Sequence, residues 1–169
     1  MTIVLLVLAA YLMGSIPTSY LVGRLRGIDL REHGSGNLGG TNAFRVMGIG
    51  AAAPVVAIDV LKGFIPAQFF PAWDGSASGD LALLYGLAAI LGHVWSVFMR
   101  FRGGKGVATG AGVLVALAPA SALIGLLVWI GFVAITRYVS VASIAAATSV
   151  PVTAWLTDES MSTVEVAQT

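Results

Sequence analysis

The sequence has no cysteine and few charged residues for its length of 169. The absence of cysteine excludes disulfides, thiolate metal sites and a cysteine nucleophile. Charged residues make up 10% of the chain, against about 25% in a typical soluble domain. With two histidines and no cluster of His, Asp and Glu, we expect no metal site. The net charge of +1 says nothing about partners, and we expect no cofactor and no nucleic-acid partner. Because 57% of the residues are hydrophobic, the sequence indicates an integral membrane protein.

Long apolar stretches without charge predict an all-α fold, a polytopic bundle of about six membrane-spanning helices. A helix needs about 20 apolar residues to cross a hydrocarbon core of about 30 Å. The charge-free stretch 106–136 would reach about 46 Å as one helix, so we expect Ala118-Pro119-Ala120-Ser121 to divide it into two short spans, a hairpin. We expect the first helix to be retained, and kinked at Pro17. The predicted spans are 2–23, about 51–70, 81–99, two short spans within 106–136, and 139–156, giving a membrane-embedded domain over 1–156 and a polar tail over 157–169.

The placement of the cations predicts the orientation of the bundle. With these spans every Lys and Arg can be assigned to one end, since Lys62, which lies deeper, can extend its long side chain toward that end. Cytoplasmic loops carry an excess of Lys and Arg. We therefore expect this end to be cytoplasmic, with the N-terminus and the acidic loops 74–80 and 158–165 external.

The longest polar run in the chain is residues 34–45, here called the first glycine loop. Its four glycines allow positive φ angles and a close approach of backbone to a ligand. Successive backbone amides in such a loop can bind an anion. A flexible linker is the alternative, but linkers are usually repetitive Gly and Ser. Here the other side chains include the hydrogen-bonding groups of Ser35, Asn37, Thr41, Asn42 and Arg45.

Residues 103–106, here called the second glycine loop, have a similar character. Gly103 and Gly104 give a flexible pair, Lys105 gives a cation, and a helix is expected to begin at Gly106, where free amides attract anions. The spacing differs from that of a nucleotide-binding loop. With both loops on one membrane face, we expect a small phosphorylated substrate held by Arg45 and Lys105.

Three other sites carry polar groups within or beside predicted spans. Asp59 and Lys62 are neighbours on one helical face, and we favour a structural ion pair there. His93 precedes the second glycine loop and is either a packing residue or a base. Ser143 opens the last span on the same membrane face and is either a helix-capping residue or a phosphate ligand.

These motifs resemble a known family. The pattern Gly34-Ser35-Gly36-Asn37-x-Gly39-x-Thr41-Asn42 is followed by Asp59-x-x-Lys62-Gly63 and Gly92-His93-x4-Phe98, and then by Gly103-Gly104-Lys105-Gly106-Val107-Ala108-Thr109 and Arg137-Tyr138-x-Ser140-x-x-Ser143. In this order they are similar to the motifs of the bacterial acyl-phosphate-dependent glycerol-3-phosphate acyltransferases. The resemblance runs from about residue 8 to residue 156.

The resemblance implies a small bundle in the bacterial inner membrane whose active site faces the cytoplasm. Its substrates would be glycerol 3-phosphate and acyl phosphate, and its product lysophosphatidic acid, used in phospholipid synthesis. It further implies that Ser35 is essential, that Arg45, Lys105 and Ser143 contact the phosphates, and that Asn37 and Thr41 shape the pocket. No Ser-His-Asp grouping is evident, so we expect the donor's own phosphate to accept the proton, with His93 as the alternative base.

Other functions stay open at this point. The family has a seventh helix, with a His-x-x-Asn segment and a Gly-x-Glu, whereas residues 157–169 are polar and too short to span, so an inactive truncated relic is one alternative. A small transporter of a phosphorylated solute is another, because intramembrane charges and Gly-interrupted helices occur in transporters. Residues 1–80 and 81–156 show no repeat of each other, and the polar residues crowd one face, which favours the enzyme.

Overall fold

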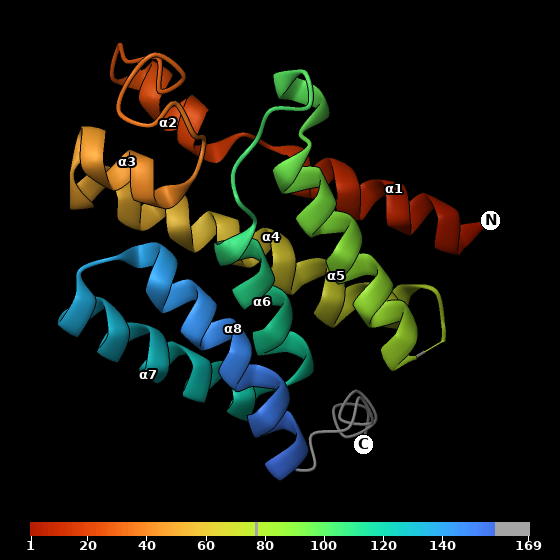
Figure 1. Ribbon diagram of the computed structural model, residues 1–169. Helices are drawn as coiled ribbons and strands as arrows, with labels where there is room; N and C mark the ends of the chain where they lie inside the picture. Colours follow the sequence, from red (N-terminus) through yellow and green to blue (C-terminus); the bar gives the residue numbers. More distant parts are fainter. Residues whose placement is uncertain (77, 158–169) are drawn as a thin grey trace.

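The computed structural model describes residues 1–76 and 78–157, and within them every regular element is a helix (Figure 1). The predicted polar tail, residues 157–169, lies outside the described residues except for Thr157. The elements are α1 (Thr2–Ser15), α2 (Thr18–Leu25), α3 (Gly40–Met47), α4 (Ile49–Trp73), α5 (Gly79–Val94), the 3₁₀ helix η1 (Val97–Met99), α6 (Val107–Leu117), α7 (Pro119–Thr136) and α8 (Val139–Leu156).

The centre of the bundle is built from helix crossings at which two backbones touch. A Cβ added to Gly63 on α4 would overlap the carbonyl oxygen of Thr109 on α6, and Gly112 on α6 lies equally close to the backbone of α4. Helices α1 and α5 cross in the same way at Gly14 and Gly92. Small residues at such crossings allow close van der Waals packing, which replaces the hydrophobic driving force that lipid cannot supply.

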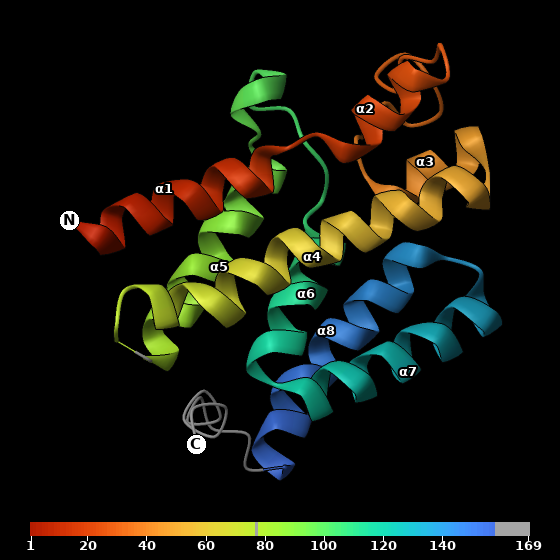
Figure 2. The ribbon, with the colours of Figure 1, turned by 180° about the vertical axis from the view of Figure 1, so that it is seen from behind.

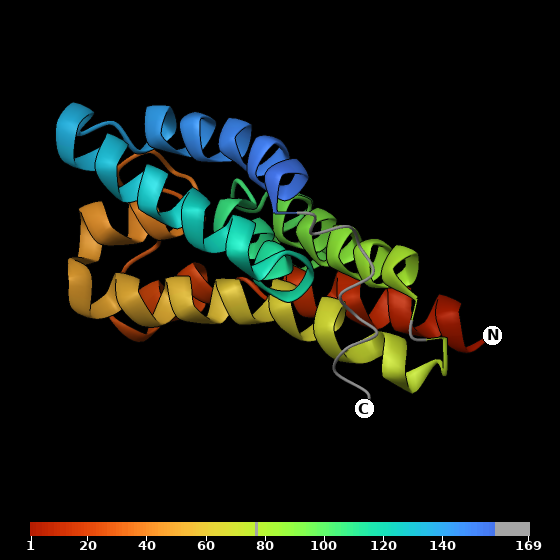
Figure 3. The ribbon, with the colours of Figure 1, turned by 90° about the horizontal axis from the view of Figure 1, so that it is seen from below.

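Two breaks in the helices fall where the sequence predicts them. The N-terminal span is interrupted between α1 and α2 at Ile16 and Pro17, because Pro17 has no N–H to continue the helix. The charge-free stretch divides at Ala118, with Pro119 at the start of α7, where proline is well tolerated. Helices α7 and α8 then pack side by side as a hairpin whose contact with the rest runs mainly through α6 (Figure 3).

The all-helical membrane bundle is confirmed, but the six expected spans are not of equal length. Helix α6 has 11 residues, which is about 16 Å at 1.5 Å per residue and shorter than the hydrocarbon core of a bilayer. Its length is thus about half of that thickness. Within the described residues, five segments are long and apolar enough to span: Thr2–Leu25, Ile49–Trp73, Gly79–Met99, Pro119–Thr136 and Val139–Leu156.

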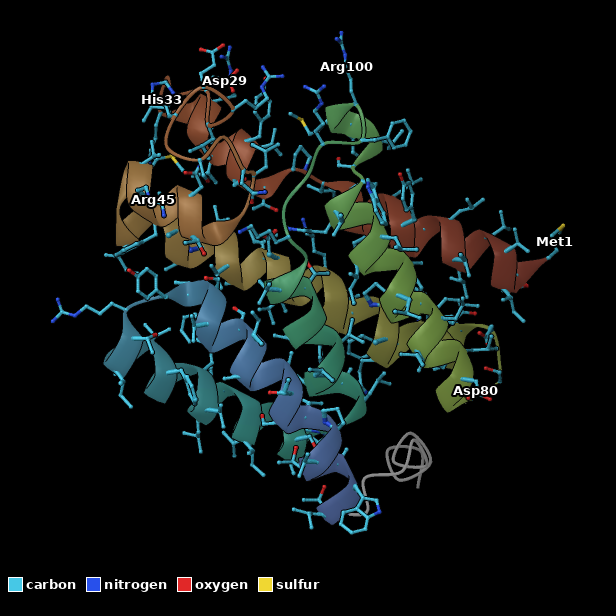
Figure 4. The ribbon with its side chains drawn as sticks, viewed as in Figure 1. Met1, Asp29, His33, Arg45, Asp80 and Arg100 are labelled. Carbon is cyan, nitrogen blue, oxygen red and sulfur yellow. The ribbon has the colours of Figure 1, made fainter. Side chains whose placement is uncertain are left out.

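The polar segments gather at one end of the bundle. Figure 2 shows α4 running along the bundle toward the α2–α3 segment, and in Figure 4 Asp29, Arg45 and Arg100 lie at the end opposite to Met1 and Asp80. The loops with most of the cations thus share an end.

Lys62 departs from the sequence-based expectation. Instead of extending toward the interface it is 4% exposed and points to neighbouring backbone. The cause is that two acceptors lie within reach inside the bundle, the carbonyl of Ile16 and the carboxylate of Asp59.

The charge distribution predicts which end faces the cytoplasm. Because the native chain has no cysteine, single-cysteine variants can be labelled cleanly with a membrane-impermeant maleimide. We expect Asn37→Cys to react only from the cytoplasmic side and Ser76→Cys only from the external side, as the positive-inside rule requires. The reverse pattern would show that the bundle is inserted in the opposite orientation.

Candidate functional site

The first glycine loop is fastened by the side chain of Asn42, which is 2% exposed. Its Oδ1 accepts a hydrogen bond from the backbone N–H of Ser35 at 2.9 Å, and its Nδ2 donates to the carbonyls of His33 at 3.1 Å and Leu30 at 3.4 Å. Gly34 has a φ of +63°, and a Cβ there would overlap the Asn42 amide. One buried amide on α3 thus closes the loop and sets the place of Ser35.

The second glycine loop rests on the C-terminal turn of α5. The N–H of Gly103 donates to the carbonyl of Val94 at 3.0 Å, and the N–H of Gly104 donates to the carbonyl of His93 at 3.1 Å. A Cβ on either glycine would overlap His93, its carbonyl in one case and its ring in the other. Gly106, with a φ of +74°, then starts α6. The loop needs glycine because its backbone lies directly on another residue.

The two loops meet at a cleft of about 800 Å³. Ser35, Gly36 and Asn37 line it from the first loop, and Gly103 lines it from the second. The segment between α5 and the second loop adds Phe98, Met99, Arg100 and Arg102, while Tyr20, Arg31 and Leu38 complete the lining. The cleft therefore combines a hydroxyl, an amide, three guanidinium groups and an apolar wall.

Arg31 is held in place by two neighbours. Its Nε and Nη2 donate to the two carboxylate oxygens of Asp29, at 2.9 and 2.6 Å, and its guanidinium lies over the ring of Tyr20, 4.9 Å from the centroid. The hydrogen bonds from Arg31 lower the pKa of Asp29 to about 2. A lowered carboxyl pKa keeps the pair intact above that value and loses it only as the pH falls through about 2, so the pair persists at neutral pH.

Arg100 and Phe101 have positive φ angles of 53° and 61°. Such angles are uncommon for residues other than glycine. Here the turn is held by the buried Ser96, whose carbonyl accepts hydrogen bonds from the N–H groups of Met99 and Phe101. This strained turn aims the Phe98–Arg102 segment at the cleft.

The predicted phosphate ligands separate into two groups. Asn37 and Gly103 line the cleft together with Ser35, and Gly104 lies directly behind Gly103. Arg45, on α3, and Lys105 are exposed and do not line it. Within residues 1–76 and 78–157 neither forms an ion pair, so both long side chains remain available to an anion.

Thr41 and Ser143 lie away from the cleft lining. Thr41 is exposed in the first turn of α3. The hydroxyl of Ser143 donates to the carbonyl of Val139 at 2.8 Å and accepts a hydrogen bond from the indole of Trp129 at 3.2 Å. Ser143 thus joins α8 to α7, and the phosphate-binding roles of both residues stay predictions.

Asp59 and Lys62 form a buried ion pair, with 2.9 Å between Oδ1 and Nζ. The Lys62 ammonium also donates to the carbonyl of Ile16 at 2.8 Å. His93 Nδ1 lies 3.8 Å from the same Asp59 oxygen. His93 lines a small cavity beside Gly104 and not the cleft itself, which places the predicted alternative base behind the second glycine loop.

Sequence reasoning missed the cations that line the cleft. Arg31, Arg100 and Arg102 were used only to orient the bundle, and Asn42 was noted as a polar group without a role. One signal was available for Arg100 and Arg102, because both lie within three residues of the glycine pair of the second loop. For Arg31 and Asn42 the position in the sequence contains no such signal, since both depend on how residues 26–42 fold back.

The fold and the cleft together define a class: a multi-pass membrane protein with a positively charged cleft at one end. The profile of the family described as glycerol-3-phosphate acyltransferase matches residues 4–168. The chain belongs to this family.

Curated relatives and solved structures agree with this assignment. The chain is 50% identical over 161 residues to a glycerol-3-phosphate acyltransferase of Chlorobaculum parvum, covering 89% of this chain and 69% of that protein. It is 47% identical over 154 residues to the enzyme of the same name from Desulforudis audaxviator, covering 89% and 75%.

Two crystal structures of PlsY (YgiH), an integral membrane glycerol 3-phosphate acyltransferase, share the fold. Its glycerol 3-phosphate form is 42% identical, with a TM-score of 0.86 over 93% of this chain and 78% of that one. Its lysophosphatidic acid form is 39% identical with the same TM-score, over 99% and 83%.

The fastening of the first glycine loop can be tested at Asn42. Asn42→Ala removes three hydrogen bonds, each worth about 0.5–1.5 kcal/mol, so we expect faster hydrogen exchange at the Ser35 amide and at least a tenfold loss of activity. Asn42→Asp keeps the acceptor for the Ser35 amide but loses the two donated hydrogen bonds. Its exchange rate and its activity should therefore lie between those of the unsubstituted protein and those of Asn42→Ala. Exchange at Ser35 unchanged in Asn42→Ala would contradict this account.

Proposed function

We propose that this protein transfers a fatty acyl group from acyl phosphate to the 1-hydroxyl of glycerol 3-phosphate, giving lysophosphatidic acid. The observation that carries the proposal is the meeting of the two glycine loops at one cleft that also contains three arginines. A chain with the same fold, 42% identical, has been solved in a glycerol 3-phosphate form. An anion-binding cleft at one end of a membrane bundle suits a charged acceptor and a lipidic donor.

The reaction requires the cleft mainly to position the two substrates and to neutralise the charge of their phosphates. Acyl phosphate is a mixed anhydride and is already activated, so the acceptor hydroxyl oxygen attacks the carbonyl carbon and the bond from that carbon to the phosphate oxygen breaks. The departing phosphate accepts the hydroxyl proton. Orientation of this kind is worth up to about 7–11 kcal/mol, and fixed donors aimed at the developing negative charge add to it.

The walls of the cleft supply groups for both substrates. The Ser35 hydroxyl and the Asn37 amide suit the acceptor hydroxyls, and the guanidinium groups of Arg31, Arg100 and Arg102 suit phosphates, which they can bind bidentately. Arg45 and Lys105 flank the cleft and extend to the same phosphates. Phe98 and Met99 offer an apolar surface for the start of the acyl chain.

The location follows from the substrates and the charges. We place the protein in the bacterial cytoplasmic membrane with the cleft at the cytoplasmic surface, where a soluble acceptor can reach it. The donor's chain then stays among the membrane lipids while its phosphate enters the cleft.

The activity is tested with purified protein, glycerol 3-phosphate and palmitoyl phosphate. We expect release of inorganic phosphate with formation of lysophosphatidic acid, and no loss of rate in a chelator, because no cluster of three His, Asp or Glu occurs in the described residues to hold a metal. Glycerol 3-phosphate uptake into liposomes without turnover would indicate a transporter instead. Binding of glycerol 3-phosphate without turnover would indicate an inactive relic.

The roles of the flanking cations are tested by substitution. Charge-assisted hydrogen bonds contribute roughly 1.5–3 kcal/mol each, so Arg45→Ala and Lys105→Ala should each lower kcat/KM by about 10- to 150-fold. Arg45→Lys should not restore activity, because Lys lacks the planar fork of Arg. Arg24→Ala serves as the control, since Arg24 is exposed on α2 and does not line the cleft. Near-normal kcat/KM in both Arg45→Ala and Lys105→Ala would remove these residues from the site.

A further inference from the structure

Three ionisable side chains are buried together beneath the cleft. Asp59 and Lys62 on α4 and His93 on α5 are 1%, 4% and 6% exposed. Charged residues within membrane spans are costly and usually serve a function. The three are here called the buried array, and the acyl-transfer mechanism above uses none of them.

The array touches the second glycine loop through His93. The backbone carbonyl of His93 accepts the N–H of Gly104, and the imidazole Nε2 lies so close to Gly104 that a Cβ would overlap it. The other ring nitrogen faces the Asp59 carboxylate, 3.8 Å away. That nitrogen forms no hydrogen bond within the described residues, so His93 is packed between Asp59 on α4 and the loop, whose backbone rests on its ring.

The array also touches the segment that leads to the first glycine loop. Lys62 donates to the carbonyl of Ile16 at 2.8 Å, at the break between α1 and α2. A cavity of about 10 Å³ brings Lys62 and His93 together with Leu38 of the first loop and Gly103 and Gly104 of the second. Leu38 and Gly103 line the cleft as well. Each loop thus has one residue that lines both the cleft and the small cavity beside the array, Leu38 in the first loop and Gly103 in the second.

We propose that Asp59, Lys62 and His93 are positioning residues that set the separation of the two glycine loops. The ion pair fixes Lys62 against the helix break below the first loop, and Asp59 holds the His93 ring against the second loop. The width of the cleft then depends on a rigid polar support inside the membrane. The kinetic part of this inference rests on the proposed function, whereas the structural part does not.

This geometry also changes the role of His93. A general base must approach the proton that it removes to about 2.6–3.2 Å, directly or through one water. His93 is covered by Gly104 on the cleft side, and its own cavity has room for at most about one water molecule. Its contribution is therefore to hold Gly104 in place, and glutamine, which is polar but does not titrate, can take its place.

The loop separation can be measured without any activity. Because the native chain has no cysteine, spin labels can be placed at Glu32→Cys and Arg102→Cys, both exposed and each just before one of the two glycine loops, with the protein in lipid nanodiscs. His93→Ala should broaden or shift the distance distribution between the labels, while His93→Gln should keep the unsubstituted distribution. Val113→Ala, a buried truncation between α5 and α6, controls for general loosening and should also keep it.

The role of the Asp59–Lys62 ion pair is tested by substituting both residues together. Lys62→Met alone leaves the Asp59 carboxylate buried without its cation and is expected to reduce the folded yield. Asp59→Asn with Lys62→Met removes both charges, which buried pairs often tolerate. The double variant should fold, and its label distances should broaden as in His93→Ala.

Kinetics separate positioning from base catalysis. Misplacement by about 1 Å can cost roughly a hundredfold. His93→Ala should therefore raise the KM for glycerol 3-phosphate about tenfold or more with a smaller fall in kcat, and His93→Gln should recover most of the loss. Equal loss of kcat in both variants, with unchanged label distances, would make His93 a base and overturn the inference. Unchanged distances in both His93→Ala and the double variant would also overturn it, whereas an inactive unsubstituted chain with changed distances would contradict only the proposed function.

Discussion

A helix that breaks inside a membrane leaves backbone groups that water cannot reach, and this constraint shapes the cleft end of the bundle. The break between α1 and α2 contains Pro17, which has no N–H and stops the first helix. The carbonyls of Ser15 and Ile16 therefore lose the donors that a continuous helix would supply. The Ile16 carbonyl is satisfied by the ammonium of Lys62, and the Ser15 carbonyl by the hydroxyl of Ser96. Lys62 belongs to α4 and Ser96 to the short segment between α5 and η1, so satisfying the break also ties these two parts of the bundle to it.

Hydrogen bonds within the protein also hold the two glycine loops. Asn42 accepts a hydrogen bond from Ser35 in the first loop and donates to two carbonyls just before it, and the last turn of α5 accepts hydrogen bonds from the Gly103 and Gly104 amides of the second loop. Neither loop depends on a ligand for these hydrogen bonds. A cleft whose backbone is already ordered loses little conformational entropy when an anion binds, which favours affinity without large contact area.

Much of the architecture could be predicted because it follows from local properties. The length of the apolar stretches predicted the helices, and the prolines predicted the breaks near Pro17 and Pro119. The i, i+3 spacing of Asp59 and Lys62 predicted their ion pair. The motifs indicated the family, which the comparisons confirm. The prediction failed at Lys62, which was expected to reach the interface, because its acceptor belongs to a helix 46 residues earlier in the chain.

Side-chain direction around the cleft could not be predicted from order along the chain. The hydrogen bond that Ser143 accepts from Trp129 depends on α7 lying beside α8, and its role toward a phosphate stays a prediction. Arg31 reaches the cleft because Asp29 and Tyr20 hold it there.

The position of the α7–α8 hairpin has a consequence for biosynthesis. Every residue that lines the cleft lies between Tyr20 and Gly103, and the buried support beneath it comes from α4 and α5. Ribosomes deliver chains from the N-terminus, and earlier segments generally fold first. The cleft and its support are therefore fully synthesised before Pro119 leaves the ribosome, and the hairpin joins an assembly whose central packing, α4 against α6, is already available.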